Sequence, residues 1–146
     1  MNTLLLLVAL TIIACLGFYA GSLLFKLRTQ RQLRDRKTQQ RIDNISQSIQ
    51  TIARALEQQQ CNVSEGCIRL FHLLEALPLN DKPNFSQQFT GLYSLYEQVK
   101  DLPTHDARKA QTKRETKRQD IQREEVEAEL ESQILLEVAV LKTFTI

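Results

Sequence analysis

Glycine, proline and tryptophan are scarce in this chain of 146 residues, which has four Gly, three Pro and no Trp. The sequence has no Gly-rich loop of the kind that cradles phosphate, no nucleophile elbow, and no His pair on a helix with a neighbouring acid. Runs of β-branched residues are few beyond residue 25, whereas Gln, Glu, Arg and Leu are abundant. The composition therefore predicts an all-α fold, and it gives no support for an enzyme, a catalytic residue or a cofactor.

Charge is missing altogether from Leu4 to Phe25, which reads LLLLVALTIIACLGFYAGSLLF. As a helix this stretch would rise roughly 33 Å, enough to cross a hydrocarbon core of about 30 Å. Seven Lys and Arg against the single acid Asp35 follow between residues 26 and 41. Because short segments rich in Lys and Arg remain in the cytoplasm, we expect a single transmembrane helix with the N-terminus outside and the remaining chain cytoplasmic.

Two alternatives would change this assignment. A cleaved secretory signal is disfavoured, because the first residues carry no Lys or Arg and the apolar stretch is longer than a signal core. The residues Ile12, Ile13, Ala14 and Cys15 resemble a bacterial lipoprotein processing site, which would place the body on the other side of the membrane. The apolar stretch continues to Phe25, however, where exported lipoproteins become polar.

The chain is predicted to divide into an anchor over residues 1–25, a basic neck over 26–41 and a helical bundle domain over 42–146. No Pro or Gly occurs between residues 27 and 60, so the anchor helix is expected to continue beyond the membrane. Apolar residues then recur at steps of three and four. This seam covers about two heptads and indicates packing against other helices rather than a long coiled coil. Its members are Ile42, Ile45, Ile49, Ile52 and Leu56.

Three further helices are predicted in the bundle domain. The first begins near Asn62, a good N-cap, and ends before Pro78, with an apolar stripe made of Cys67, Leu70, Phe71, Leu74 and Leu77. Residues 78–84 form a turn. The next helix, 85–99, carries Phe85, Phe89, Leu92, Tyr96 and Val99, and Gly91 is expected to allow a neighbour to approach closely.

The last helix is expected to run from a cap at Thr104 to about Lys142, with its charge sorted along its length. Residues 107–118 hold six basic side chains and one acid, residues 119–131 hold six acids and one basic side chain, and 134–141 are almost entirely apolar. We expect this helix to return along the first one. The acids would then lie beside Arg36 and Arg41, and residues 134–141 near Leu27 and Leu33.

Metal and thiol chemistry find little support. His72 lies five residues after Cys67 and eleven after Cys61, which does not match the paired, short-spaced ligands of a structural zinc site, so no metal is expected. His105 follows Pro103 and is interpreted as a turn residue. In the cytoplasm Cys61 and Cys67 are expected to remain reduced. A thiol or metal sensor using these residues is the weakest of the functional hypotheses.

Several residues are candidates for contacts. Gly17 and Gly21 form a Gly-x-x-x-Gly pattern that lets two transmembrane helices approach, which would give a homodimer. Lys26, Arg28, Arg31 and Arg34 are placed to contact anionic lipid head groups, although the topology signal explains them equally well. Residues 107–118 are not expected to bind nucleic acid, because aromatic residues are missing there and the acidic block that follows would repel phosphate.

Two segments, CNVSEGCIRLFHLLEAL and LYEQVKDLPTHDARK, lie in a chain with one N-terminal apolar span, a basic helical neck and a long charged last helix. In this combination the chain resembles a family of small bacterial single-span membrane proteins classed as a domain of unknown function. The resemblance implies an inner-membrane location and supplies no established activity and no site residues.

The function best supported by the sequence is a membrane-anchored helical scaffold or adaptor that acts by protein–protein contact at the cytoplasmic face. Its protein partner is unknown. The alternative is a membrane-tethered regulator that binds nucleic acid or anionic lipid through basic helices.

Overall fold

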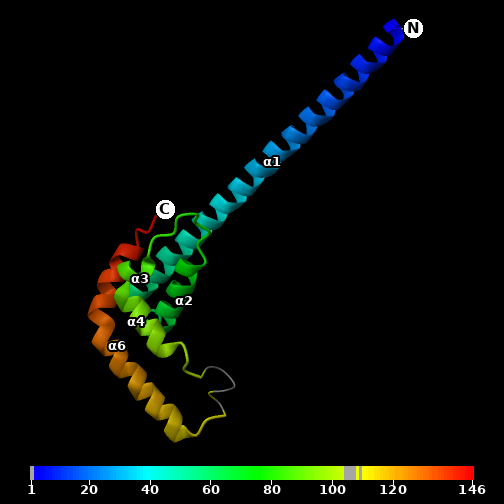
Figure 1. Cartoon of the computed structure of the whole chain (residues 1–146). Helices are drawn as coiled ribbons and strands as arrows, with labels where there is room; N and C mark the ends of the chain where they lie inside the picture. Colours follow the sequence, from blue (N-terminus) through cyan, green and yellow to red (C-terminus); the bar gives the residue numbers. More distant parts are fainter. Residues whose placement is uncertain (1, 104–107, 109) are drawn as a thin grey trace. The chain divides into compact units, whose positions relative to one another are not determined.

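The computed structural model describes residues 2–103, 108 and 110–146, and in this part of the chain it contains helices and no strand (Figure 1). The prediction of an all-α fold with a long N-terminal and a long C-terminal helix is confirmed. The helices are α1 (Asn2–Glu57), α2 (Val63–Glu75), α3 (Phe85–Gln88), α4 (Thr90–Val99) and α6 (Lys113–Leu141). The chain forms two compact units, Met1–Gln40 and Arg41–Ile146, which are described separately below.

The first unit is the N-terminal part of α1. By length and composition, α1 is one helix capable of crossing a membrane: its segment Ile12–Glu57 contains an 18-residue window with a mean hydropathy of 1.3 and no buried residue. Ser22 and Thr29 donate their hydroxyl hydrogens to the carbonyls of Tyr19 and Phe25 on the preceding turn. Such bonds to the preceding turn satisfy the hydroxyl groups of small polar side chains within a helix.

The second unit contains the hydrophobic core, formed by apolar stripes on α1, α2, α3, α4 and α6. The heptad seam of α1 packs as predicted, with Ile49 and Leu56 buried and its other members at the edge of the core. Contact between α1 and α2 is close at Gly66, where an added Cβ would lie 2.5 Å from Leu56 Cδ2. The buried apolar residues are Ile49, Ala53, Leu56, Cys67, Leu70, Leu74, Leu77, Phe85, Phe89, Leu92, Leu95, Val99, Ile134, Val138 and Leu141.

The start of α2 follows the sequence prediction. Asn62 has an extended backbone, and its side-chain oxygen accepts a hydrogen bond from the backbone N–H of Ser64 at 2.9 Å. This satisfies one of the amide donors that a helix leaves unpaired at its beginning. The helix ends at Glu75, before Pro78. Its predicted boundaries are therefore confirmed.

The prediction of one helix over residues 85–99 is wrong, because the helix is interrupted at Phe89. This residue has φ −121° and ψ 61°, which ends α3 at Gln88 and allows α4 to start at Thr90. The Phe89 side chain is buried in the core at this position. The first amides of α4 are satisfied by Glu137 of α6.

The prediction that the last helix runs unbroken from Thr104 is also wrong. Thr104 and His105 lie outside the described residues, and Ala110 and Gln111 are not helical. The long helix α6 starts at Lys113, after a capping box in which Thr112 and Glu115 satisfy each other's backbone N–H groups. The expected continuous helix is therefore interrupted by non-helical residues before Thr112.

The expected register of the returning helix is wrong as well. Just beyond α6, Lys142 forms an ion pair with Glu57, and the Phe144 carbonyl accepts a hydrogen bond from Gln50 at 2.9 Å. Both partners lie much further along α1 than Leu27 and Leu33, whose side chains are about half exposed. Burial of Ile134, Val138 and Leu141 in the core determines this register, since it outweighs exposed ion pairs.

Candidate functional site

An apolar groove lies between the end of α6 and the break that separates α3 from α4. It has a volume of about 430 Å³ and is lined by Gln88, Phe89, Leu136, Glu137 and Val140. The side chains of Leu136 and Val140 are 73% and 60% exposed, whereas Phe89 is buried. Large apolar side chains gathered at one exposed place are typical of contact surfaces.

Glu137, one of the residues that line the groove, connects α6 to α4. One oxygen of this carboxylate accepts a hydrogen bond from the Gly91 N–H at 2.7 Å, and the other accepts one from the Leu92 N–H at 2.9 Å. Phe89, the N-cap residue of α4, makes no side-chain cap. Glu137 therefore caps α4 from α6, and its negative charge lies at the end of α4 where the helix dipole favours it.

Gly91 makes this approach feasible. A Cβ atom on Gly91 would lie 3.0 Å from Gln133 Cγ and 3.2 Å from the Glu137 carboxylate. Gln133 also donates a hydrogen bond to the Thr90 hydroxyl at 2.6 Å. The close approach that the sequence predicted at Gly91 is thus confirmed, and the approaching element is α6.

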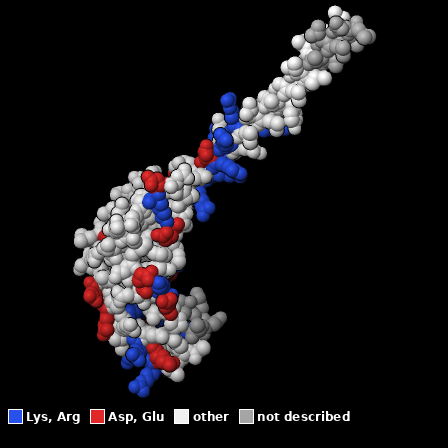
Figure 2. Space-filling view, viewed as in Figure 1, with Lys and Arg blue, Asp and Glu red and all other residues white. Residues whose placement is uncertain are grey.

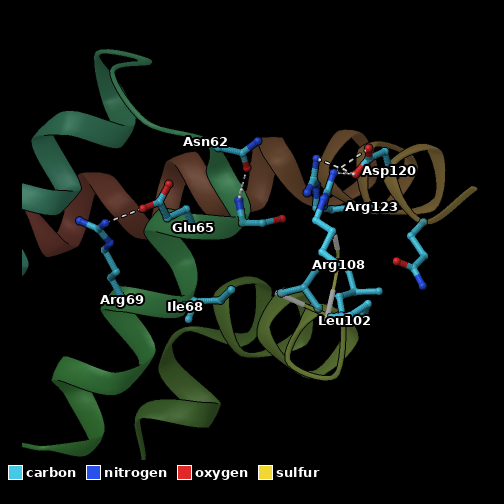
Figure 3. Close-up of a pocket in the computed structure, with 12 residues that line it drawn as sticks. Asn62, Glu65, Ile68, Arg69, Leu102, Arg108, Asp120 and Arg123 are labelled. Atoms are coloured by element: carbon cyan, nitrogen blue, oxygen red, sulfur yellow. Dashed lines mark hydrogen bonds and ion pairs between the residues drawn. The ribbon is translucent and has the colours of Figure 1, made fainter. Parts of the chain in front are cut away.

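A second hollow of about 550 Å³ lies between the start of α2, the end of α4 and the first half of α6. Figure 3 shows Arg108 and Arg123 converging on Asp120. Arg108 Nη2 lies 2.7 and 2.8 Å from the two Asp120 oxygens, and Arg123 Nη2 lies 3.5 Å from one of them. Arg123 Nε is also 3.5 Å from Glu127, which accepts a hydrogen bond from Ser64.

These residues form a continuous polar network that ties α2 to α6 and to Arg108. The remaining arginine at the hollow, Arg69, is paired with Glu65 on its own helix. Each guanidinium at this hollow therefore faces a carboxylate of the chain itself. Such pairing fixes the position of helices, and it leaves no arginine without an acidic neighbour to receive an anionic ligand.

The thiols and the exposed histidine are not gathered into a site. Cys67 is buried, and its burial, followed by the nearby charges of Glu137 and Glu127, raises the pKa of the thiol to about 12. Burial also raises the pKa of Cys61. A raised pKa keeps a thiol protonated and unreactive. The His72 ring lies against Phe71 and Tyr96, and no group of three or more potential metal ligands occurs among the described residues.

The candidate contact residues in α1 lie apart from the groove in the sequence. A Cβ on Gly17 or Gly21 would meet no atom within 4 Å. The side chains of Lys26, Arg28, Arg31 and Arg34 are exposed, and in the described part of the chain they form no ion pair. Their roles in helix pairing and in lipid contact remain predictions.

Sequence reasoning missed the groove and its central residue. In the sequence, Glu137 is the single charge in the apolar segment 134–141, and its hydrogen-bond partners lie 46 and 45 residues away in the chain. The only local signal was a carboxylate in the middle of the segment ILLEVAVL, next to side chains that the core buries. A carboxylate beside buried side chains requires a hydrogen-bond partner. A single acid in an apolar helical segment is therefore a pattern in the sequence that indicates such a partner.

The fold and the groove define an all-α protein with a long apolar N-terminal helix and a helical body, and nothing in its described residues points to catalysis. The chain belongs to a family described as protein of unknown function (DUF2489), whose model matches residues 13–141. An uncharacterized protein of Haemophilus influenzae is 38% identical over 134 residues, which cover 92% of this chain and 88% of that protein. No solved structure matches the chain.

Proposed function

We propose that this protein is a single-pass membrane protein whose helical body, on the cytoplasmic side, acts as a scaffold or adaptor by binding another protein. The length and apolar composition of α1 support the anchor, and the basic residues that follow support the orientation. The family match supports neither an activity nor a substrate. The apolar groove at the end of α6 is the observation that supports a role in binding another protein.

The groove is suited to a short apolar segment of a partner protein. Leu136 and Val140 are one helical turn apart, and both are exposed beside Phe89. The only acid in its lining, Glu137, already accepts two backbone hydrogen bonds, so the groove offers mainly apolar contact. A partner side chain such as Leu or Phe would bury this apolar surface at about 25 cal/mol per Å².

Photo-crosslinking tests this role. A benzophenone side chain placed at Leu136 is expected to capture one protein in stoichiometric amount, and Val140→Asp should abolish the capture while leaving the helical content unchanged. The matched control is the same photoprobe at Ser94, which is exposed on α4. Equal capture from both positions, or capture that survives Val140→Asp, would exclude the groove as the contact.

Orientation has a separate test. A reporter active only in the cytoplasm should work when it is fused after Ile146, whereas a reporter active only outside should not. The reverse result, or a mature chain that starts at Cys15, would refute the proposed topology.

The alternative hypothesis keeps one supporting observation, which is the exposure of Lys26, Arg28, Arg31 and Arg34. In the described structure these side chains form no ion pair, so they are available to anionic head groups at roughly 1 kcal/mol each. Mass spectrometry of lipids that copurify with the protein tests this role. Replacement of all four by Gln should lower the ratio of anionic to zwitterionic lipid, with orientation checked by the reporters.

A further inference from the structure

The apolar groove at the end of α6 is continued along the same helix by two exposed acids. Val140 and Leu136 form the exposed part of the groove, and Glu129 and Glu125 follow them toward the start of α6. The four positions are separated by four, seven and four residues, and such steps keep side chains on one side of a helix. We call Glu125 and Glu129 the acidic stripe.

The other exposed acids of this part of α6 are not aligned with the groove. Glu131 and Glu124 precede Leu136 by five and twelve residues, which is about 1.4 and 3.3 turns, so they lie on a different flank of the helix. On that flank their neighbour is Glu127, which accepts a hydrogen bond from Ser64 of α2. Alignment with the groove therefore distinguishes the acidic stripe from the remaining acids.

The charge of the acidic stripe is not neutralised within the described part of the chain. Both side chains are exposed, and among the described residues they form no ion pair or hydrogen bond. None of the residues three or four positions from either acid is Lys or Arg, and two like charges one turn apart repel each other. Figure 2 shows Lys and Arg gathered where α6 begins, and Asp and Glu along the outer edge of the part that follows. A cation beside the acidic stripe would therefore be favourable.

We propose that the protein bound at the groove presents a basic amphipathic helix, with an apolar side chain in the groove and Lys or Arg opposite the acidic stripe. This inference rests on the proposed adaptor role. Leu136 is seven residues from Glu129 and eleven from Glu125, or about 10.5 and 16.5 Å along α6. A partner helix lying along α6 has the same rise, so its basic residues would stand about two and three turns from its apolar anchor.

The charges along α6 also disfavour other occupants of the groove. An anionic membrane surface would be repelled by the acidic stripe, and so would a partner with acids beside its apolar anchor. Arg118 and Arg114 continue the same line toward the start of α6, at seven and eleven residues from Glu125. Further basic turns of the partner would face these arginines. The basic part of the partner helix is therefore expected to be short.

Photo-crosslinking from Leu136 with charge-reversed variants of the full chain tests this inference. Glu125→Lys with Glu129→Lys should reduce capture by about tenfold, because both attractions become repulsions. Glu124→Lys with Glu131→Lys changes the net charge equally on the other flank and is the matched control. Capture by the control should stay within about twofold of wild type, since salt screens exposed charges that are not in contact. Circular dichroism checks that both variants keep their helical content. An equal effect of the two charge reversals on capture would overturn the inference.

The captured segment provides a second test. Mass spectrometry of the crosslinked peptide should find Lys or Arg about two and three turns from the apolar residue at the attachment point. Changing these basic residues to Glu should abolish capture by wild type and restore capture by the Glu125→Lys, Glu129→Lys chain. A segment without such residues, or no restoration, would overturn the inference.

Failure of this inference can be distinguished from failure of the adaptor role. Capture at Leu136 that is lost in Val140→Asp but is indifferent to the acidic stripe would leave the adaptor role supported and would refute the basic helix as its partner. No capture at Leu136 in any variant would refute both.

Discussion

Glu137 accepts a hydrogen bond from the backbone N–H of Gly91 at 2.7 Å, although 46 residues separate them in the chain. The same carboxylate accepts a second bond from the next amide. The first amides of α4, which has no side-chain cap of its own, therefore bond to a carboxylate of α6. This relationship connects the break at Phe89, the start of α4 and the position of α6.

Replacement of Glu137 by Ala should destabilise the protein by about 1–3 kcal/mol, because two amides at the start of α4 lose a charged acceptor. Glu137→Gln, which keeps one oxygen, should cost less. Chemical unfolding followed by circular dichroism in mild detergent measures the difference. Glu124→Ala is the matched control on the exposed side of the same helix and should change stability by less than about 0.5 kcal/mol.

Gly66→Ala should destabilise the second unit by about 1–3 kcal/mol, since the added methyl would lie 2.5 Å from Leu56 Cδ2 in the core. Combining it with Leu56→Ala should give a smaller loss than the sum of the two single losses, because the clash then disappears. A double-mutant cycle of unfolding free energies measures this coupling. Strict additivity would contradict the close packing of α1 on α2.

Substitutions in the apolar tail should separate buried from exposed positions. Val138 is 1% exposed, so Val138→Asp should destabilise by about 2–5 kcal/mol through a buried unpaired charge. Leu136→Asp, with the native side chain 73% exposed, should have little effect on stability while impairing partner capture at the groove. Thermal unfolding measures the effect of each substitution on stability, and photo-crosslinking measures its effect on partner capture. Equal destabilisation by both variants would contradict the observed burial.

The sequence predicted those parts of the fold that depend on local signals. The stripe of α2 and its cap at Asn62 follow from residues close together in the chain. The capping box of Thr112 and Glu115 also involves residues close together in the chain, and the sequence contains its Thr-x-x-Glu pattern. The start of α6 was therefore predictable, although the prediction placed the start of the last helix at Thr104.

The break at Phe89 and the register of α6 could not be predicted in this way. Nothing near Phe89 forbids a helix, since the acceptor that favours the break is the distant Glu137. The register was inferred from charge, but the core selects it through Ile134, Val138 and Leu141. Exposed ion pairs are individually weak, so the sorted charge of α6 was a poor guide to packing within one chain.

The contacts of Glu75 predict a pH dependence of stability. Its carboxylate accepts hydrogen bonds from Lys82 at 2.6 Å and from the Tyr93 hydroxyl at 2.7 Å, and these bonds lower the pKa of Glu75 below its usual value. The resulting stabilisation is present above the unfolded-state pKa near 4.5 and is lost as pH falls through the lower folded-state pKa. Wild type should therefore exceed Glu75→Gln in stability at pH 7, and the difference should shrink below pH 4.5.

Urea unfolding at a series of pH values measures this difference. Tyr93→Phe keeps the ring and removes the hydroxyl donor, so its loss of stability at pH 7 should be smaller than that of Glu75→Gln and should shrink over the same pH range. A difference between wild type and Glu75→Gln that stays constant down to the acid limit would show that the carboxylate contributes by shape and not by charge.

The last prediction concerns Gly17 and Gly21 in the apolar part of α1. Added Cβ atoms at both positions would meet no atom of the same chain within 4 Å, so these glycines are not required by packing within one copy. If they bring two transmembrane helices together, changing both to Ile should abolish self-association of the isolated span in a membrane reporter assay, because the larger side chains hold the helices apart. Insertion should persist, since Ile is strongly apolar. Leu16→Ile with Leu23→Ile is the matched control and should leave the signal unchanged. Association that survives in the double Ile variant would make both glycines ordinary residues of the span.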